Sequence, residues 1–76
     1  MFTMHFNGEA PLYEALYDYM KEAVATGAMK EGEKLPSKRN LARHLGLSVN
    51  TVTAAYDQLV DEGYLIAKER VGYFVA

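Results

Sequence analysis

The chain has 76 residues, half of them apolar, and its formal net charge at pH 7 is −2. A chain of this length builds one small core, which buries about 60–65% of the surface that the unfolded chain exposes. It contains no cysteine, which excludes disulfides, thiolate zinc sites and cysteine nucleophiles. The N-terminal residues lack the pattern of a signal peptide and no run of about 18 apolar residues occurs, so we expect a cytoplasmic protein with no membrane partner.

The charges are distributed unevenly along the chain. Residues 1–35 carry three lysines against six acidic residues, which gives −3, and residues 61–76 carry two basic residues against three acidic ones, which gives −1. Residues 36–60 carry Lys38, Arg39 and Arg43 against Asp57 alone, which gives +2. Nucleic-acid binders usually have a basic patch, and this middle segment is the only basic one in the chain.

The first 26 residues divide into an arm and a helix. Residues 1–10 show no hydrophobic period and contain the turn signal Asn7-Gly8, so we predict a flexible N-terminal arm. Pro11 suits the first position of a helix, and Gly27 suits the position after its end. We therefore predict a helix over residues 11–26, with apolar positions three or four residues apart: Leu12, Leu16, Tyr19 and Ala23.

Two further helices follow a short extended segment. Lys34 and Leu35 precede a proline, which disfavours helical backbone there, so a very short strand is expected. Ser37 then caps a helix that ends at Gly46, with Leu41, Ala42 and Leu45 facing inward. Ser48 caps the next helix, at about residues 48–62, which Gly63 ends. Its buried stripe is predicted to be Val52, Ala55, Tyr56 and Leu59.

The end of the chain is predicted to form a β-hairpin. Aromatic and β-branched residues at 64–67 and 73–75 flank a polar link that ends in Gly72. The order of elements is therefore helix, short strand, helix, tight turn, helix and hairpin. We predict a mainly α domain over residues 11–76, a winged helix-turn-helix of three helices with the hairpin as its wing at 64–75.

The second helix offers a basic ridge. Arg39 and Arg43 are four residues apart and lie roughly opposite Leu41 and Leu45. In a helix-turn-helix the first of the two helices crosses the sugar-phosphate backbone, so these arginines suit phosphate contacts. The alternative is an ordinary solvated face.

The third helix offers polar residues that are able to read bases. A rotation of about 100° per residue gives a face opposite the buried stripe that carries Asn50, Ala54, Asp57 and Asp61. Thr51 and Thr53 flank this face. Asparagine pairs with adenine edges and threonine bonds to bases or phosphates, whereas aspartate repels phosphate. The helix should therefore enter the major groove with its N-terminus first. The alternative role for Ser48, Asn50 and Thr51 is helix capping.

Outside the two helices, Lys68 and Arg70 lie near the tip of the predicted wing, which Gly72 is expected to allow to turn tightly. There they would meet a minor groove or phosphates. Their alternative role is solubility. No phosphate-binding glycine loop or Ser-His-Asp arrangement occurs, and His5 and His44 are isolated, so we expect no enzymatic activity and no metal site.

Two stretches of the chain resemble the GntR superfamily of bacterial transcription regulators. They are Leu35 to Val52, which contains Leu35-Pro36-Ser37 and Leu45-Gly46-Leu47-Ser48, and Ala55 to Leu65. The Ala55-Tyr56 pair and the ending Glu62-Gly63-Tyr64-Leu65 look most like the MocR branch, typified by GabR-like regulators. The YtrA-like branch is the alternative.

The resemblance implies a DNA-binding head that contacts a double-stranded operator in the nucleoid. In the MocR branch such a head is joined to a C-terminal domain that binds pyridoxal phosphate and dimerises, so we expect no cofactor in this chain and a homodimeric full-length parent. Two departures stand out, since many relatives have arginine at the position of Val49 and a Gly-x-Gly tip at Arg70-Val71-Gly72. The complete candidate set for DNA binding is Ser37, Lys38, Arg39, Arg43, Ser48, Asn50, Thr51, Thr53, Lys68 and Arg70.

A different class of function stays open. A winged helix is also able to serve as a protein-protein interaction module that binds no DNA. This interaction hypothesis predicts that Arg39 and Arg43 could be neutralised without loss of function. It also predicts that no salt-dependent DNA binding occurs.

Overall fold

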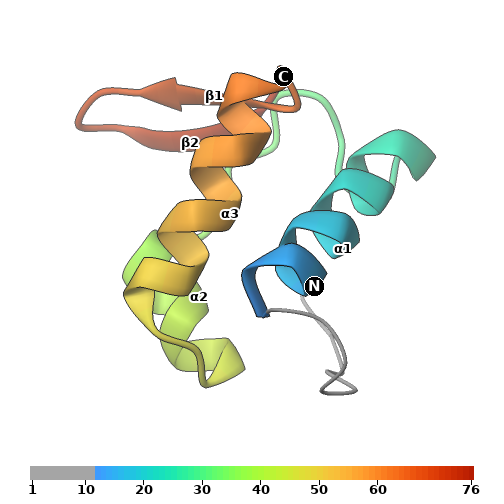
Figure 1. Ribbon diagram of the computed structural model, residues 1–76. Helices are drawn as coiled ribbons and strands as arrows, with labels where there is room; N and C mark the ends of the chain where they lie inside the picture. Colours follow the sequence, from blue (N-terminus) through green and yellow to red (C-terminus); the bar gives the residue numbers. More distant parts are fainter. Residues whose placement is uncertain (1–11) are drawn as a thin grey trace.

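The computed structural model describes residues 12–76; the predicted arm and Pro11 lie outside the described residues. Five elements follow in order: α1 (Leu12–Thr26), α2 (Lys38–Leu45), α3 (Val49–Asp61), β1 (Leu65–Lys68) and β2 (Gly72–Val75) (Figure 1). The three helices and the hairpin confirm the predicted winged helix-turn-helix. No helix within residues 12–76 is long and apolar enough to cross a membrane.

The boundaries of α2 and α3 follow from local capping. The Ser37 hydroxyl accepts a hydrogen bond from the Asn40 N–H at 3.1 Å, and the Ser48 hydroxyl accepts one from the Thr51 N–H at 3.1 Å. Each bond satisfies an N–H that the first turn of a helix leaves without a partner. Gly46 ends α2 with a φ of +71°, in the left-handed region that glycine adopts without strain. Both predicted N-caps are confirmed.

The core forms around α3, which lies between α1 and α2 in Figure 1. All four residues of the predicted α3 stripe are fully buried: Val52, Ala55, Tyr56 and Leu59. They pack with Leu16 and Met20 of α1, with Leu41 and Ala42 of α2, and with Leu65 and Val75 of the hairpin. Because α3 contacts every other element of the core, its opposite face is the one left for a partner.

The predicted buried face of α1 is partly wrong. Leu16 is buried as expected, but the other buried residues of α1 are Tyr17 and Met20, and Leu12 is 43% exposed. Tyr19 and Ala23 are only half-buried, at the margin of the core. Apolar residues occur on several sides of α1, so local periodicity does not select one face. The position of α3 selects it.

The hairpin is held on both edges of β2. On one edge β1 pairs antiparallel with β2, from Leu65 opposite Val75 to Lys68 opposite Gly72. On the other edge the Leu35 N–H donates to the Tyr73 carbonyl at 2.8 Å, and the Val75 N–H donates to the Glu33 carbonyl at 2.9 Å. The short strand predicted at residues 34–35 is therefore a single bridge, between Lys34 and Phe74, and it ties the wing to the segment before α2.

Candidate nucleic-acid interface

The N-terminal half of α3 presents small, uncharged side chains. Asn50 and Ala54 are exposed, while Thr51 and Thr53 are half-buried at the edges of this face. Ser48 provides the helix cap and also shares a hydrogen bond of 2.8 Å with the Thr51 hydroxyl, so the exposed Asn50 amide is not used for capping. This face carries the hydrogen-bonding groups that recognise base edges.

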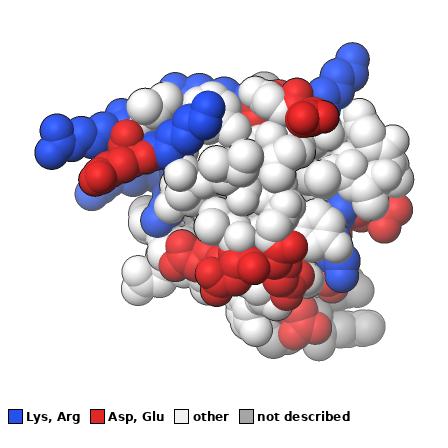
Figure 2. All heavy atoms as spheres, turned by 90° about the horizontal axis from the view of Figure 1, so that it is seen from above, with Lys and Arg blue, Asp and Glu red and all other residues white. Residues whose placement is uncertain are grey.

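The C-terminal half of α3 is acidic. Asp57, Asp61 and Glu62 are exposed there, and Figure 2 shows acidic side chains gathered in a band over this part of the molecule. Glu62 accepts hydrogen bonds from the Tyr17 hydroxyl of α1 and from Gln58 Nε2 at 3.1 Å, and these bonds lower the pKa of its carboxyl group. This end of α3 is therefore attached to α1 and repels phosphate, as the sequence predicted for Asp57 and Asp61.

Both arginines of the predicted ridge on α2 are exposed. Arg39 and Arg43 lie one turn apart in the helix that precedes the tight turn. Ser37, at the start of this helix, is also exposed, although its oxygen accepts the capping hydrogen bond. A hydroxyl group that accepts such a bond still has its own hydrogen to donate to a phosphate.

Tyr56 connects α3 to both flanking parts of the candidate interface. Its hydroxyl donates to the Pro36 carbonyl at 2.8 Å, just before α2, and its ring centroid lies 4.9 Å from that of Tyr73 in β2. On the same Tyr73 ring lies the ammonium group of Lys38, 5.3 Å from the ring centroid. Burial, with a smaller contribution from Tyr73, raises the pKa of the Tyr56 phenol. These contacts set the position of α2 and of the wing relative to α3.

The wing carries the cations that the sequence predicted. Lys68 and Arg70 are exposed, and the Lys68 ammonium group lies 4.6 Å from the centroid of the Phe74 ring. Figure 2 shows basic side chains gathered at the end of the molecule toward which the hairpin projects. The electrostatic field of the ring attracts an ammonium group over its face, so Phe74 favours this position of the Lys68 side chain.

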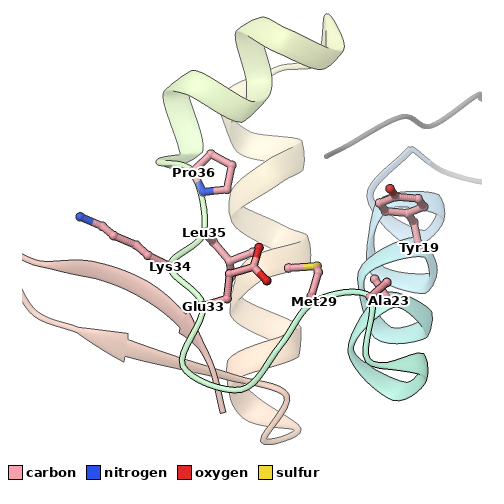
Figure 3. Close-up of a pocket in the computed structure, with 8 residues that line it drawn as sticks. Tyr19, Ala23, Met29, Glu33, Lys34, Leu35 and Pro36 are labelled. Carbon is pink, nitrogen blue, oxygen red and sulfur yellow. The ribbon is translucent and has the colours of Figure 1, made fainter.

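The structure also brings Lys34 to the wing, which sequence analysis missed. A Cβ atom at Gly72 would lie only 3.2 Å from Lys34 Cε, and Figure 3 shows the Lys34 side chain pointing away from α1. Lys34 is exposed. The sequence indicated an extended segment before Pro36, but it did not indicate that this segment pairs with β2. Lys34, Lys68 and Arg70 together form what we call the wing cluster.

The turn at the wing tip differs from the expectation. A hydrogen bond of 3.0 Å from the Val71 N–H to the Lys68 carbonyl closes it, and Arg70 has a φ of +64°. Gly72 was expected to allow the tight turn, but it is the first residue of β2, where it has a φ of +138°. A turn with positive φ at its third residue favours glycine or asparagine, so arginine is unusual here.

A groove of about 610 Å³ lies between α1 and residues 28–36 (Figure 3). Tyr19 and Ala23 line it on the side of α1, and Met29, Leu35 and Pro36 line it on the other. None of the ten residues predicted to bind DNA lines this groove. Lys34 also lines the groove, so the groove adjoins the candidate interface through this one member of the wing cluster.

Comparison with known proteins identifies the family to which this chain belongs. The family model described as "Bacterial regulatory proteins, gntR family" matches residues 12–75. The chain is 50% identical over 66 residues to the uncharacterized HTH-type transcriptional regulator YdeL of Bacillus subtilis (strain 168), covering 87% of this chain and 14% of YdeL. It is 34% identical over 76 residues to the probable rhizopine catabolism regulatory protein MocR of Rhizobium meliloti, covering 100% of this chain and 15% of MocR. The chain therefore spans about one seventh of the length of these relatives.

Two solved structures extend the likeness to the fold. YtrA from Sulfolobus acidocaldarius, a GntR-family transcription factor, has a TM-score of 0.86 at 40% identity, over 96% of this chain and 77% of that one. The DNA-binding domain of AraR in complex with operator ORX1 has a TM-score of 0.83 at 25% identity, over 100% of this chain and 93% of that one. Matches thus occur to both MocR and YtrA, so they do not separate these branches.

Proposed function

Since this chain belongs to the gntR family of bacterial regulatory proteins and is a winged-helix DNA-binding domain of that family, we propose that it reads double-stranded operator DNA with α3 in the major groove. The observation that carries the proposal is the uncharged polar face at the N-terminal half of α3, a helix that packs against α2, on which Arg39 and Arg43 are exposed. The AraR domain, which has the same fold, was solved in complex with an operator.

The division of charge along α3 sets the direction of docking. Asn50, Thr51 and Thr53 offer hydrogen-bond donors, acceptors and methyl groups to base edges. The negatively charged carboxylates of Asp57 and Asp61 would instead be repelled by DNA phosphates. The helix therefore enters the groove with its N-terminus and leaves it after about Ala54. Ser48, at the start of the helix, contacts the phosphate beside the entry point in this proposal.

The remaining candidate residues hold the domain on the DNA backbone. Arg39 and Arg43 contact phosphates on one side of the groove, with Ser37 and Lys38 at the start of the same helix. The wing cluster contacts the neighbouring minor groove or its phosphates. These cations compensate for the net charge of −2, because they lie along the contact with DNA, whereas the acidic residues of α3 lie at the end of the helix that has left the groove.

Three alanine variants test this assignment against duplexes selected from a random pool by the wild-type domain. Arg39→Ala should weaken binding by about 1–3 kcal/mol, and Arg43→Ala should weaken all sequences alike and reduce the slope of log affinity against log salt by about one unit. Asn50→Ala should instead relax the base preference at one or two positions. Lys30→Ala, an exposed cation outside the interface, is the matched control and should change neither affinity nor slope.

The measurements are fluorescence anisotropy of labelled duplexes over a salt series and the melting temperature of each variant. If Arg39→Ala lowers the melting temperature as strongly as it lowers affinity, Arg39 is a structural residue. Complete absence of salt-dependent binding would favour a protein-protein interaction module instead.

The longer parent is part of the proposal. We place this domain in a cytoplasmic, nucleoid-associated homodimer, in which a C-terminal domain of MocR type binds pyridoxal phosphate. The relative MocR supports this branch, and the match to YtrA supports the alternative. Within residues 12–76 we propose no cofactor and no catalytic activity, so pyridoxal phosphate added to the domain should form no saturable adduct on a single lysine.

A further inference from the structure

Val49 is an exposed apolar residue at the leading end of α3. It is the first residue of the helix, directly after the Ser48 cap, and 42% of its surface is accessible to solvent. It is not part of the hydrophobic core. β-branched side chains lower helix propensity slightly, so helix stability does not explain a valine at this position.

The geometry of α3 places Val49 beside the residues that face the bases. At about 100° per residue, Val49 and Thr53 are one turn apart and share one edge of the helix, next to Asn50. Val49 and Thr53 both carry methyl groups, and neither carries a charge. The leading edge of α3 thus combines methyl groups with a neighbouring amide.

The chemistry of the major groove offers one partner for such a side chain. Among the base edges exposed there, only thymine presents a methyl group, at C5, and the other bases present hydrogen-bond donors and acceptors. Valine has no polar atom in its side chain to pair with those groups. We propose that Val49 contacts the 5-methyl group of a thymine and makes the domain select thymine at that position. This inference rests on the proposed function, because it requires α3 to enter the groove with its N-terminus.

Removal of single methyl groups from the DNA tests the contact. In a duplex selected by the wild-type domain, each thymine is replaced in turn by deoxyuridine, which differs from thymine only by the missing 5-methyl group. We expect one or two positions at which the replacement weakens wild-type binding about fourfold, as burial of one methyl or methylene group implies. Val49→Ala should bind the thymine and deoxyuridine duplexes equally at those positions.

Val71→Ala is the matched control, because Val71 is an even more exposed valine, at 55%, in the wing turn. It should keep the fourfold sensitivity to deoxyuridine. Melting temperatures check that Val49→Ala folds, and they should not fall, because the side chain is exposed and alanine favours helix.

The possible results separate the two proposals. The inference is wrong if no thymine position is sensitive, or if Val49→Ala keeps the full sensitivity at the same positions, while specific DNA binding persists. Absence of sequence-specific binding by the wild-type domain would overturn the proposed function, and this inference with it.

Discussion

Replacement of Arg70 by glycine should change stability and DNA affinity in opposite directions. Arg70 is the third residue of the turn between β1 and β2 and has a φ of +64°. A residue with a Cβ atom costs roughly 1–2 kcal/mol in this region, which glycine avoids. Glycine also gives the unfolded chain more freedom, which offsets about 0.4–1 kcal/mol of the gain. We expect Arg70→Gly to raise the free energy of unfolding by about 0.5–1 kcal/mol and the melting temperature by roughly 2–8 °C.

DNA binding should respond in the other direction. Loss of one cation from the wing cluster should weaken binding and reduce the slope of log affinity against log salt by about one unit. Arg70→Ala is the matched control, because it removes the same cation but keeps a Cβ atom at the strained position. It should reproduce the loss of affinity without the gain in stability.

Urea denaturation followed by circular dichroism gives the free energies of unfolding, and anisotropy over a salt series gives the slopes. Equal stability of Arg70→Gly and Arg70→Ala would refute the argument from backbone strain. An unchanged slope in both variants would show that Arg70 does not contact DNA.

Three further predictions concern packing, backbone conformation and assembly. Tyr56→Phe leaves the Pro36 carbonyl without its partner and should reduce the free energy of unfolding by about 1–2 kcal/mol; a loss below about 0.5 kcal/mol in urea denaturation would contradict this. Because burial raises the pKa of Tyr56 above its ordinary 10.0, the stability that it contributes is complete below pH 10 and is lost as the pH rises further. The melting temperature of Tyr56→Phe should therefore fall less steeply at alkaline pH than that of the wild type. Gly72→Ala should lower stability by about 1–2 kcal/mol, since its φ of +138° disfavours a Cβ atom, and an unchanged melting temperature would be evidence against that. The free domain should bind a single half-site weakly, whereas two tethered copies should gain about 10²–10⁴ in avidity on two correctly spaced half-sites; nanomolar binding by the free domain to one half-site in physiological salt would contradict this.

Much of α2 and α3 could be predicted because their signals are local. Ser37 and Ser48 cap through hydrogen bonds to residues three positions later, and Gly46 ends α2 at a left-handed turn. The stripe from Val52 to Leu59 is the widest apolar face of α3 and contains all of its buried residues, so the apolar period indicates which side of this helix is buried. The same periodicity leaves the polar face, with Asn50, exposed to solvent.

The face of α1 could not be predicted in the same way. Tyr17 and Met20 are buried, while Leu12 is exposed, although all three are apolar residues of one helix. A helix with apolar residues on several sides has several faces that are able to pack. The contact with α3 selects one of them, and the hydrogen bond from Tyr17 to Glu62 forms on that same side.

By itself, the sequence determined the elements, their order, the caps and the residues of the α2 and α3 surface, because each depends on neighbours within about one helical turn. The tertiary structure decided how the wing joins that surface. Pairing of β2 with residues 33–35 brings Lys34 beside Gly72, and Tyr56 reaches both Pro36 and Tyr73. These contacts join residues that are far apart in the chain. They depend on how the helices pack and on the register of the hairpin, which no local pattern of residues encodes.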